Sequence, residues 1–195
     1  MRFPLSEESL ILGLKEGEEA AFREMVALHK DLIYNTALGF LQNELDAEDI
    51  TQEVFIKAHD SISGFKGESK LSTWLYRITV TKCLDLLRSR KRKKRFAFVQ
   101  SIFGDNEELV VQPVDFVHPG IVEERKSHAR ELFKAIEQLP EQQKVAFVLA
   151  RVEGLSHKEV SEVMETSVPA IESLLQRAKL NLRKLLTDYY QQHLH

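Results

Sequence analysis

Apolar residues recur every three or four positions along most of the chain, which is the spacing of one face of an α-helix. Ser6 before two glutamates predicts a helix start, because acidic side chains are favoured near the positive end of a helix. An apolar face predicts a second helix over residues 18–41, and a third helix with Asp46 as its cap. Two glycines within residues 61–70 predict a loop, and a fourth helix should begin near Ser72 and continue into a run of basic residues.

The helical pattern stops after Arg95 and returns near Glu123. The segment between them has two glycines, two prolines and no Lys or Arg, which predicts a linker, although its bulky apolar residues predict that part of it docks. We therefore expect an all-α protein of two small helical domains, residues 1–95 and 123–195, joined by a flexible acidic linker over residues 96–122.

The end of the chain has a pattern typical of a helix-turn-helix motif. Ser156 and Glu159 have the spacing of a capping box, so a short helix should begin there, and Ser167 can cap a longer helix after a tight turn. The start of the second helix of such a motif contacts base edges in the major groove, whereas an ordinary helical hairpin would leave the same charges in solvent. The residues expected to face outwards near this start are Ala170, Glu172, Ser173, Gln176 and Arg177, and Lys179 continues the basic surface.

Charge is sorted into blocks along the chain, although the net charge is only −3. Residues 1–65 contain five Lys or Arg and 13 Asp or Glu, whereas residues 66–95 contain 11 Lys or Arg and two acids. Residues 96–122 carry four acids and no Lys or Arg, and the remainder is balanced. Opposite charges in separate blocks predict different partners for different surfaces.

Three features of the sequence indicate the cellular compartment of the protein. The single cysteine, Cys83, allows no internal disulfide and favours a reducing environment. The longest stretch without a charged residue, residues 32–43, has 12 residues, short of the roughly 18 needed to cross a bilayer. The first residues lack the basic and then apolar order of a leader. We expect a cytoplasmic protein that is not inserted in a membrane.

The fourth predicted helix ends in seven basic residues within the eight positions 88–95. Phosphate groups relieve the repulsion within such a run, so it favours a nucleic-acid surface, although a solvated tail or a localisation signal would have the same composition. Phe65 and Trp74 lie beside basic residues, where aromatic rings can stack on unpaired bases. Trp74 could equally be a core residue.

An acidic segment precedes the basic one in the same predicted domain. Glu48, Asp49, Gln52 and Glu53 surround the apolar stripe of the third helix. No His or Cys stands at a spacing that would complete a metal site, so we expect none there. Most acidic helix faces are simply solvated, but a basic protein partner on this face and DNA on the basic one would explain the division.

In these features the chain resembles the extracytoplasmic-function (ECF) sigma factors, the small two-domain sigma factors of bacteria. The resemblance covers residues 17–186 and implies a transcription initiation factor that carries RNA polymerase to promoters, with no catalysis of its own. Inhibitory anti-sigma proteins are common partners in this family. The motifs that carry the resemblance are, in chain order, DAEDITQEVF (46–55), FKGESKLSTWLYRI (65–78), LPE (139–141), EGLS (153–156) and LLQRAK (174–179).

The resemblance also implies which residues meet each partner, and the linker would thread towards the polymerase active-site cleft. The residues implied to dock on the clamp coiled coil of core RNA polymerase are Asp46, Glu48, Asp49, Gln52, Glu53 and Phe55. The residues implied to separate and read the minus-ten promoter element are Phe65, Lys66, Gly67, Ser69, Trp74, Arg77, Thr81, Lys82, Asp85 and Arg88. The residues implied to read the duplex minus-thirty-five element are Ser167, Ala170, Glu172, Ser173, Gln176, Arg177 and Lys179.

Two positions depart from the family pattern. Thr81 stands where members often carry Asn, so the strand-separating contact is altered or shared with Asp85. Glu172 stands where a basic residue is frequent, and an acid there repels phosphate but can accept a hydrogen bond from a cytosine amino group. Both departures bear on promoter sequence and not on the class of function.

The residues alone leave two other classes of function open. An independent helix-turn-helix regulator would bind duplex DNA without polymerase, and an enzyme such as a nuclease would act at the basic run. The seven histidines are scattered, and we find no pairing of a nucleophile with a base. We therefore expect no catalytic residue, no metal and no cofactor.

Overall fold

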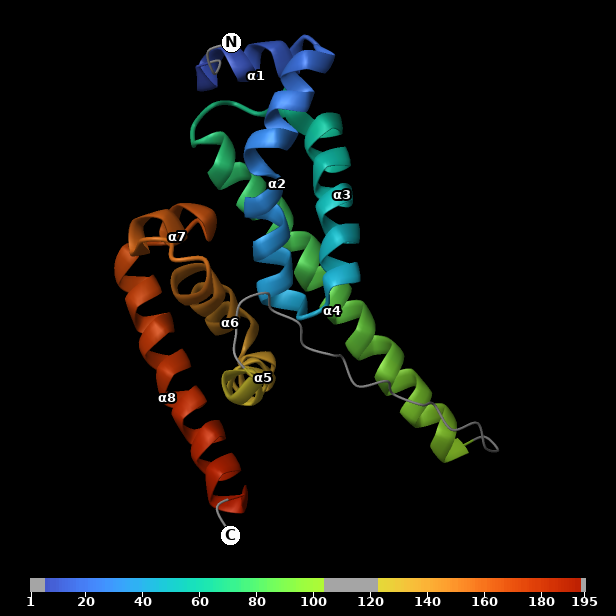
Figure 1. Ribbon diagram of the computed structural model, residues 1–195, viewed down its shortest axis with the longest axis vertical. Helices are drawn as coiled ribbons and strands as arrows, with labels where there is room; N and C mark the ends of the chain where they lie inside the picture. Colours follow the sequence, from blue (N-terminus) through green and yellow to red (C-terminus); the bar gives the residue numbers. More distant parts are fainter. Residues whose placement is uncertain (1–5, 104–122, 194–195) are drawn as a thin grey trace.

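The protein is built from two bundles of helices, seen in a computed structural model that describes residues 6–103 and 123–193 (Figure 1). No strand occurs within these ranges, which confirms the all-α prediction. The first bundle comprises α1 to α4, and the second comprises α5 to α8. In chain order the elements are α1 (Glu7–Lys15), α2 (Glu19–Leu41), α3 (Glu44–Ser61), the short 3-10 helix η1 (Ile62–Gly64), α4 (Leu71–Phe103), α5 (Glu123–Glu137), α6 (Glu141–Phe147), the π-helical turn η2 (Val148–Val152), α7 (His157–Val163) and α8 (Val168–His193).

In the first bundle α2, α3 and α4 pack on one another, and α1 lies across one end of α2 (Figure 1). Met25, Val54 and Leu75, one from each long helix, are almost fully buried in the shared core. The Glu7 carboxylate accepts a hydrogen bond of 2.6 Å from the backbone N–H of Leu71, the first residue of α4. Because the first N–H groups of a helix have no partner inside it, this bond lets α1 fix where α4 begins.

The cap of α3 differs from the prediction. Asn43 has an extended backbone, and its side-chain oxygen accepts a hydrogen bond of 2.9 Å from the N–H of Asp46. The expectation that Asp46 caps the helix was therefore wrong, since an amide three residues earlier fills that role. Asp46 lies in the first turn instead, where its carboxylate is 2.6 Å from the guanidinium of Arg90.

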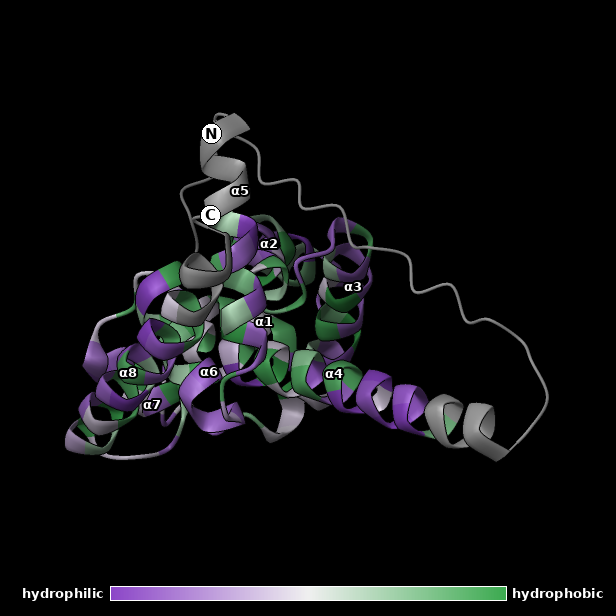
Figure 2. Ribbon diagram, turned by 90° about the horizontal axis from the view of Figure 1, so that it is seen from below, coloured by the Kyte–Doolittle hydropathy of each residue, from purple (hydrophilic) through white to green (hydrophobic). Residues whose placement is uncertain are grey.

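Helix α4 starts one residue before the predicted Ser72 and runs to Phe103, past the predicted end at Arg95. Lys and Arg are good helix formers, and no glycine or proline interrupts the helix before Gly104. The predicted linker is therefore helical over its first eight residues, 96–103, and its remainder lies outside the described residues. The basic end of α4 projects from the bundle (Figures 1 and 2).

The second bundle confirms the predicted starts of its helices. Ser156 and Glu159 form a capping box at the start of α7, with both reciprocal hydrogen bonds present. Ser167 Oγ accepts a bond of 3.4 Å from the N–H of Ala170 at the start of α8. Before α7, Gly154 has a φ of +74°, a left-handed conformation that ends the preceding helix at little cost for glycine. The predicted stripe of α8 is buried in its first four members, Ile171, Leu175, Ala178 and Leu182.

The two bundles are in contact, with α2 packed on η2 and α4 packed on α7. Gly39 on α2 permits a close approach, because a Cβ there would lie 3.2 Å from Cγ1 of Val148. Beside it the buried hydroxyl of Thr36 donates to the backbone oxygen of Leu32 at 2.7 Å and lies 3.1 Å from Oε2 of Glu153. A hydroxyl has one proton, so this bond compensates the carboxylate only in part. Burial raises the pKa of Glu153 above its ordinary value, although the Thr36 bond opposes the shift.

The raised pKa of Glu153 makes the stability of the folded chain fall as this carboxyl ionises. In the unfolded chain the carboxyl has its ordinary pKa, so the folded state holds more protons between the two values and loses stability as pH rises through them. We expect Glu153→Gln to have a higher Tm than the wild type at pH 7.5, and the difference to vanish near pH 4. For a chain of this size each 1 kcal/mol would raise Tm by roughly 2–4 °C.

Scanning calorimetry at both pH values measures this difference. Glu16→Gln, an exposed acid at the end of α1, is the matched control and should leave Tm unchanged at either pH. An equal or lower Tm for Glu153→Gln at pH 7.5 would show that burial of this carboxylate carries no penalty.

Candidate polymerase and nucleic-acid surfaces

The acidic face of α3 is only partly free. Glu48, Asp49 and Gln52 are exposed. Two other acids of the face are paired with α4. Glu53 Oε2 lies 2.8 Å from Nζ of Lys82, and Asp46 is paired with Arg90. Two acids of this face are therefore neutralised by α4, whereas Glu48 and Asp49 remain exposed.

Phe55, expected on the docking surface, belongs to the core. Its side chain is 7% exposed, and its ring meets that of Phe22 edge to face at a centroid distance of 6.5 Å. The apolar groups that α3 does expose are Leu45 at 72% and Ile56 at 62%. Periodicity could have found both, since each is an apolar residue outside the buried stripe of the helix.

A groove of about 820 Å³ lies between α3 and α4 and joins the acidic face to the basic helix. Acids and cations from both helices share its walls, so the two predicted surfaces are adjacent and not on opposite sides of the bundle. The charged and polar lining residues are Asp46, Asp49, Glu53, Lys57, Arg77, Thr81, Lys82 and Asp85, and Trp74 also contributes to the wall.

The loop before α4 keeps its aromatic residue inside. Phe65 is 6% exposed, and its ring centroid is 5.2 Å from that of Trp74, with the ring planes tilted by 44°. Trp74 is half-buried and lines the groove, so it packs against the core and is also partly accessible from the surface. Gly67 makes the turn with a φ of +75°, and it is exposed together with Lys66, whereas Ser69 is half-buried.

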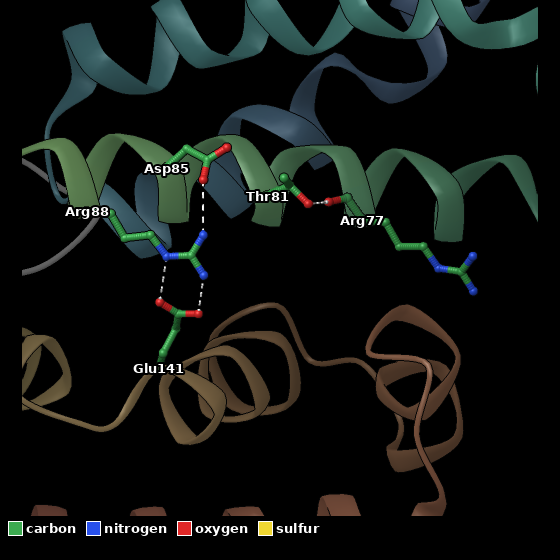
Figure 3. Close-up of polar contacts among 5 residues, drawn as sticks. All are labelled: Arg77, Thr81, Asp85, Arg88 and Glu141. Carbon is green, nitrogen blue, oxygen red and sulfur yellow. Dashed lines mark hydrogen bonds and ion pairs between the residues drawn. The ribbon is translucent and has the colours of Figure 1, made fainter.

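The outward side of α4 carries Thr81 and Asp85 (Figure 3). The Thr81 hydroxyl donates to the backbone oxygen of Arg77 at 2.8 Å, a bond within its own helix. Asp85 Oδ1 accepts from Nη1 of Arg88 at 3.1 Å. Further along the helix, residues 91–95 are all exposed and basic. Figure 2 shows a hydrophilic segment of α4 that precedes its grey end.

Two arginines of α4 reach the second bundle. Arg77 donates from Nη2 to the backbone oxygen of Glu162 at 2.7 Å and lies 3.0 Å from Oε1 of Glu165, while its buried Nε has no hydrogen-bond partner within the described residues. Arg88 donates two hydrogen bonds to the carboxylate of Glu141, one from Nε at 3.0 Å and one from Nη2 (Figure 3). The hydrogen bond to Glu141 raises the pKa of Arg88.

The start of α8 presents the residues expected to read duplex DNA. Glu172, Ser173, Gln176 and Arg177 are exposed. The Glu172 carboxylate lies 3.7 Å from Nδ1 of His157, a pair that is ionic only when the histidine is protonated. The other expected members are Ser167 and Lys179, which are exposed, and Ala170, which is half-buried.

The part of the chain that the structure describes offers neither a metal site nor a membrane span. It has no group of three or more His, Cys, Asp or Glu side chains placed to hold a metal ion. It also has no helix whose length and apolar character would suit a bilayer crossing.

The arrangement of an acidic helix, a long basic helix and a helix-turn-helix defines a class of transcription protein. The sequence matches the family "Sigma-70 region 2" over residues 25–93 and the family "Sigma-70, region 4" over residues 129–182. The chain is 33% identical to the ECF RNA polymerase sigma factor SigW of Bacillus subtilis (strain 168), over 91% of this chain and 95% of that protein. It is 29% identical to the ECF RNA polymerase sigma-E factor of Haemophilus influenzae, over 90% and 92% respectively.

Solved structures share the fold. CnrH, in complex with the cytosolic domain of CnrY, superposes with a TM-score of 0.64 at 22% identity, covering 93% of this chain and 97% of that one. The sigma factor RpoE of Bartonella quintana, in complex with the anti-sigma factor NepR, gives 0.60 at 22% identity, covering 85% and 96%. The chain belongs to the ECF sigma factors, and it is a promoter-specific transcription initiation factor.

Proposed function

We propose that three surfaces divide the work of promoter recognition. The exposed acids of α3 dock on the clamp coiled coil of core RNA polymerase, α4 with its preceding loop separates and reads the minus-ten element, and the start of α8 reads the minus-thirty-five element. The observation that carries this division is the segregation of charge within one bundle. Glu48 and Asp49 are exposed on α3, the exposed cations 91–95 lie at the far end of α4, and the ion pairs Glu53–Lys82 and Asp46–Arg90 lie between them.

Docking on polymerase requires charge and apolar anchors together. Glu48 and Asp49 supply the charge, since both are exposed and neither side chain is part of the boundary pairs. The exposed Leu45 and Ile56 on the same helix supply apolar area, and buried apolar anchors contribute most of the affinity of a typical interface. Phe55 is buried in the core, so it does not belong to this surface.

Reading the minus-ten element requires cations for phosphates and a platform for unpaired bases. The basic end of α4 supplies the cations, and the groove beside Trp74 lies further back along the same helix. Phe65 is buried against Trp74, so base capture by this loop requires that the ring pair loosen.

Residues 1–95 and 123–195 act as the two domains, with 96–122 between them, and the protein has no catalytic activity of its own. The polymerase it serves is cytoplasmic, so it acts there. An anti-sigma protein is a further partner, an idea supported by the complex in which the similar RpoE of Bartonella quintana was solved.

A run-off transcription assay tests the function directly. Core polymerase, the full chain and a library of random upstream sequences should yield transcripts from a subset of templates with two shared elements. Initiation that is no greater with the protein than without it would contradict the proposal. Tight duplex binding without polymerase would favour an independent regulator.

Reversing charge on the docking surface should weaken polymerase binding. We expect Glu48→Lys/Asp49→Lys to weaken affinity for core polymerase by at least about tenfold, because two attractive pairs become repulsive. Fluorescence anisotropy with labelled protein measures the affinity, and circular dichroism checks the helical content. The control Glu8→Lys/Glu16→Lys makes the same charge change on exposed residues at α1 and should bind normally.

Neutralising the basic end of α4 should flatten the salt dependence of promoter binding. Each lost phosphate contact lowers the slope of log K against log salt by about 0.7 for single strands and 0.9 for duplex. Lys93→Gln/Lys94→Gln should therefore lower the slope for the polymerase complex by roughly 1.4–1.8. Lys15→Gln/Lys30→Gln removes the same charge elsewhere in the bundle, and an identical slope in both variants would refute phosphate contact by α4.

Changing a base reader on α8 should alter sequence preference and not only affinity. Gln176→Ala should relax selection at one or two upstream base pairs, where a good contact discriminates by about 1–3 kcal/mol. Arg183→Gln, an exposed change further along α8, should weaken binding evenly across sequences. Selection from the same random library measures both profiles, and an unaltered profile for Gln176→Ala would remove this residue from the reading surface.

A further inference from the structure

The start of α8 carries an acid on the surface proposed to meet DNA. The side chain of Glu172 is 61% exposed and lies among the residues assigned above to the minus-thirty-five element. A carboxylate at such a position repels the phosphate backbone, so its charge by itself weakens binding. An acid is compatible with this surface when a nearby cation offsets its charge and a base edge offers it a hydrogen-bond donor.

The cation is available from the other helix of the same motif. Nδ1 of His157, the first residue of α7, lies 3.7 Å from Oε1 of Glu172. This distance suits an ion pair with a protonated imidazole, but it is too long for a hydrogen bond. Within the described residues the Glu172 carboxylate accepts no hydrogen bond, so both of its oxygens remain available to a donor in the major groove.

The packing of α7 on α8 determines how these two side chains approach each other. The capping box of Ser156 and Glu159 fixes the start of α7, and with it the backbone of His157. Glu172 follows Ile171, whose side chain has no measurable exposure and anchors the start of α8. Residues on packed helices are held in position better than residues on loops, so the two side chains can act together without a large rearrangement.

A carboxylate in the major groove favours one base over the other three. Guanine presents two acceptors there and thymine presents one, and a carboxylate repels all of these. Adenine presents an acceptor beside its amino group, whereas cytosine presents its N4 amino group with no acceptor on the same base. Cytosine is therefore the base that offers a carboxylate a donor without repulsion.

We propose that Glu172 and His157 together read one C·G base pair of the minus-thirty-five element. Glu172 accepts a hydrogen bond from the N4 amino group of cytosine. His157 is a positioning residue that orients this carboxylate and offsets its repulsion of phosphate, since the first helix of such a motif crosses the DNA backbone. Both roles rest on the proposed function of α8, and they add a residue of α7 to the reading surface.

Selection from the random upstream library, with core polymerase and the full chain, tests the role of Glu172. The wild type should enrich C·G at one upstream position. Glu172→Gln should change the ratio of C·G to A·T at that position by roughly tenfold in favour of A·T, because an amide pairs best with adenine. Glu137→Gln removes the same charge from an exposed residue of α5 and should keep the wild-type profile. An unchanged profile for Glu172→Gln would overturn the proposal.

A double-mutant cycle separates the positioning role of His157 from a structural one. His157→Ala should lower the enrichment of C·G by roughly threefold in the wild-type background and leave the profile unchanged in the Glu172→Gln background. Lys158→Ala removes the next cation of α7, which is exposed, and should weaken binding evenly across sequences. Equal effects of His157→Ala in the two backgrounds would contradict its positioning role.

A change in the DNA tests the same contact without altering the protein. N4-methylcytosine still pairs with guanine, but a methyl group replaces the amino hydrogen that points into the major groove. At the selected C·G pair and with subsaturating protein, it should lower the run-off transcript of the wild type by roughly tenfold and leave that of Glu172→Ala unchanged. Equal wild-type transcript from the methylated and unmethylated templates would refute the contact.

The wild-type selection also distinguishes failure of this reader from failure of the proposed function. Two enriched promoter elements without a preference for C·G at any upstream position would overturn the reader and leave the function of α8 intact. Absence of an enriched upstream element would contradict the proposed function of α8, and the reader with it.

Discussion

The packing of α4 against α2 and α3 is the constraint on which the rest of the structure depends. Leu75, Thr79 and Cys83 hold one side of this helix in the core with no measurable exposure. The other sides are thereby fixed in direction, with cations towards solvent and the groove beside α3. Because one rigid helix carries both the buried stripe and the charged residues, loss of this packing would disperse the docking surface and the DNA surface together.

The surface charge of the first bundle depends on ion pairs between α3 and α4 as well as on the blocks of like charge along the sequence. Lys82 and Arg90 are neutralised by Glu53 and Asp46, so the cations available to DNA are those beyond the end of α3. Surface pairs of this kind stabilise the fold weakly. Their larger effect is to separate an anionic face from a cationic one within a single small bundle, where unpaired opposite charges would otherwise attract the wrong partner.

Much of the fold could be predicted from the sequence, because local signals determine it. The capping box at Ser156 and the stripe of α8 follow from spacing over a few residues. The errors arose where two local signals competed: Asn43 caps α3 in place of Asp46, and helix-forming Lys and Arg carry α4 past the predicted end. The burial of Phe55 and the Arg88–Glu141 pair depend on tertiary packing, which no local spacing records.

The contact between the bundles explains why some candidate DNA-binding residues look structural in this conformation. Arg77 has two partners in the second bundle and yet leaves its buried Nε without one among the described residues, so its hydrogen bonding is incomplete in the packed state. A buried donor without a partner carries a cost, and separation of the bundles would return that N–H to water or to a phosphate. The packed arrangement therefore holds this arginine without satisfying all of its donors.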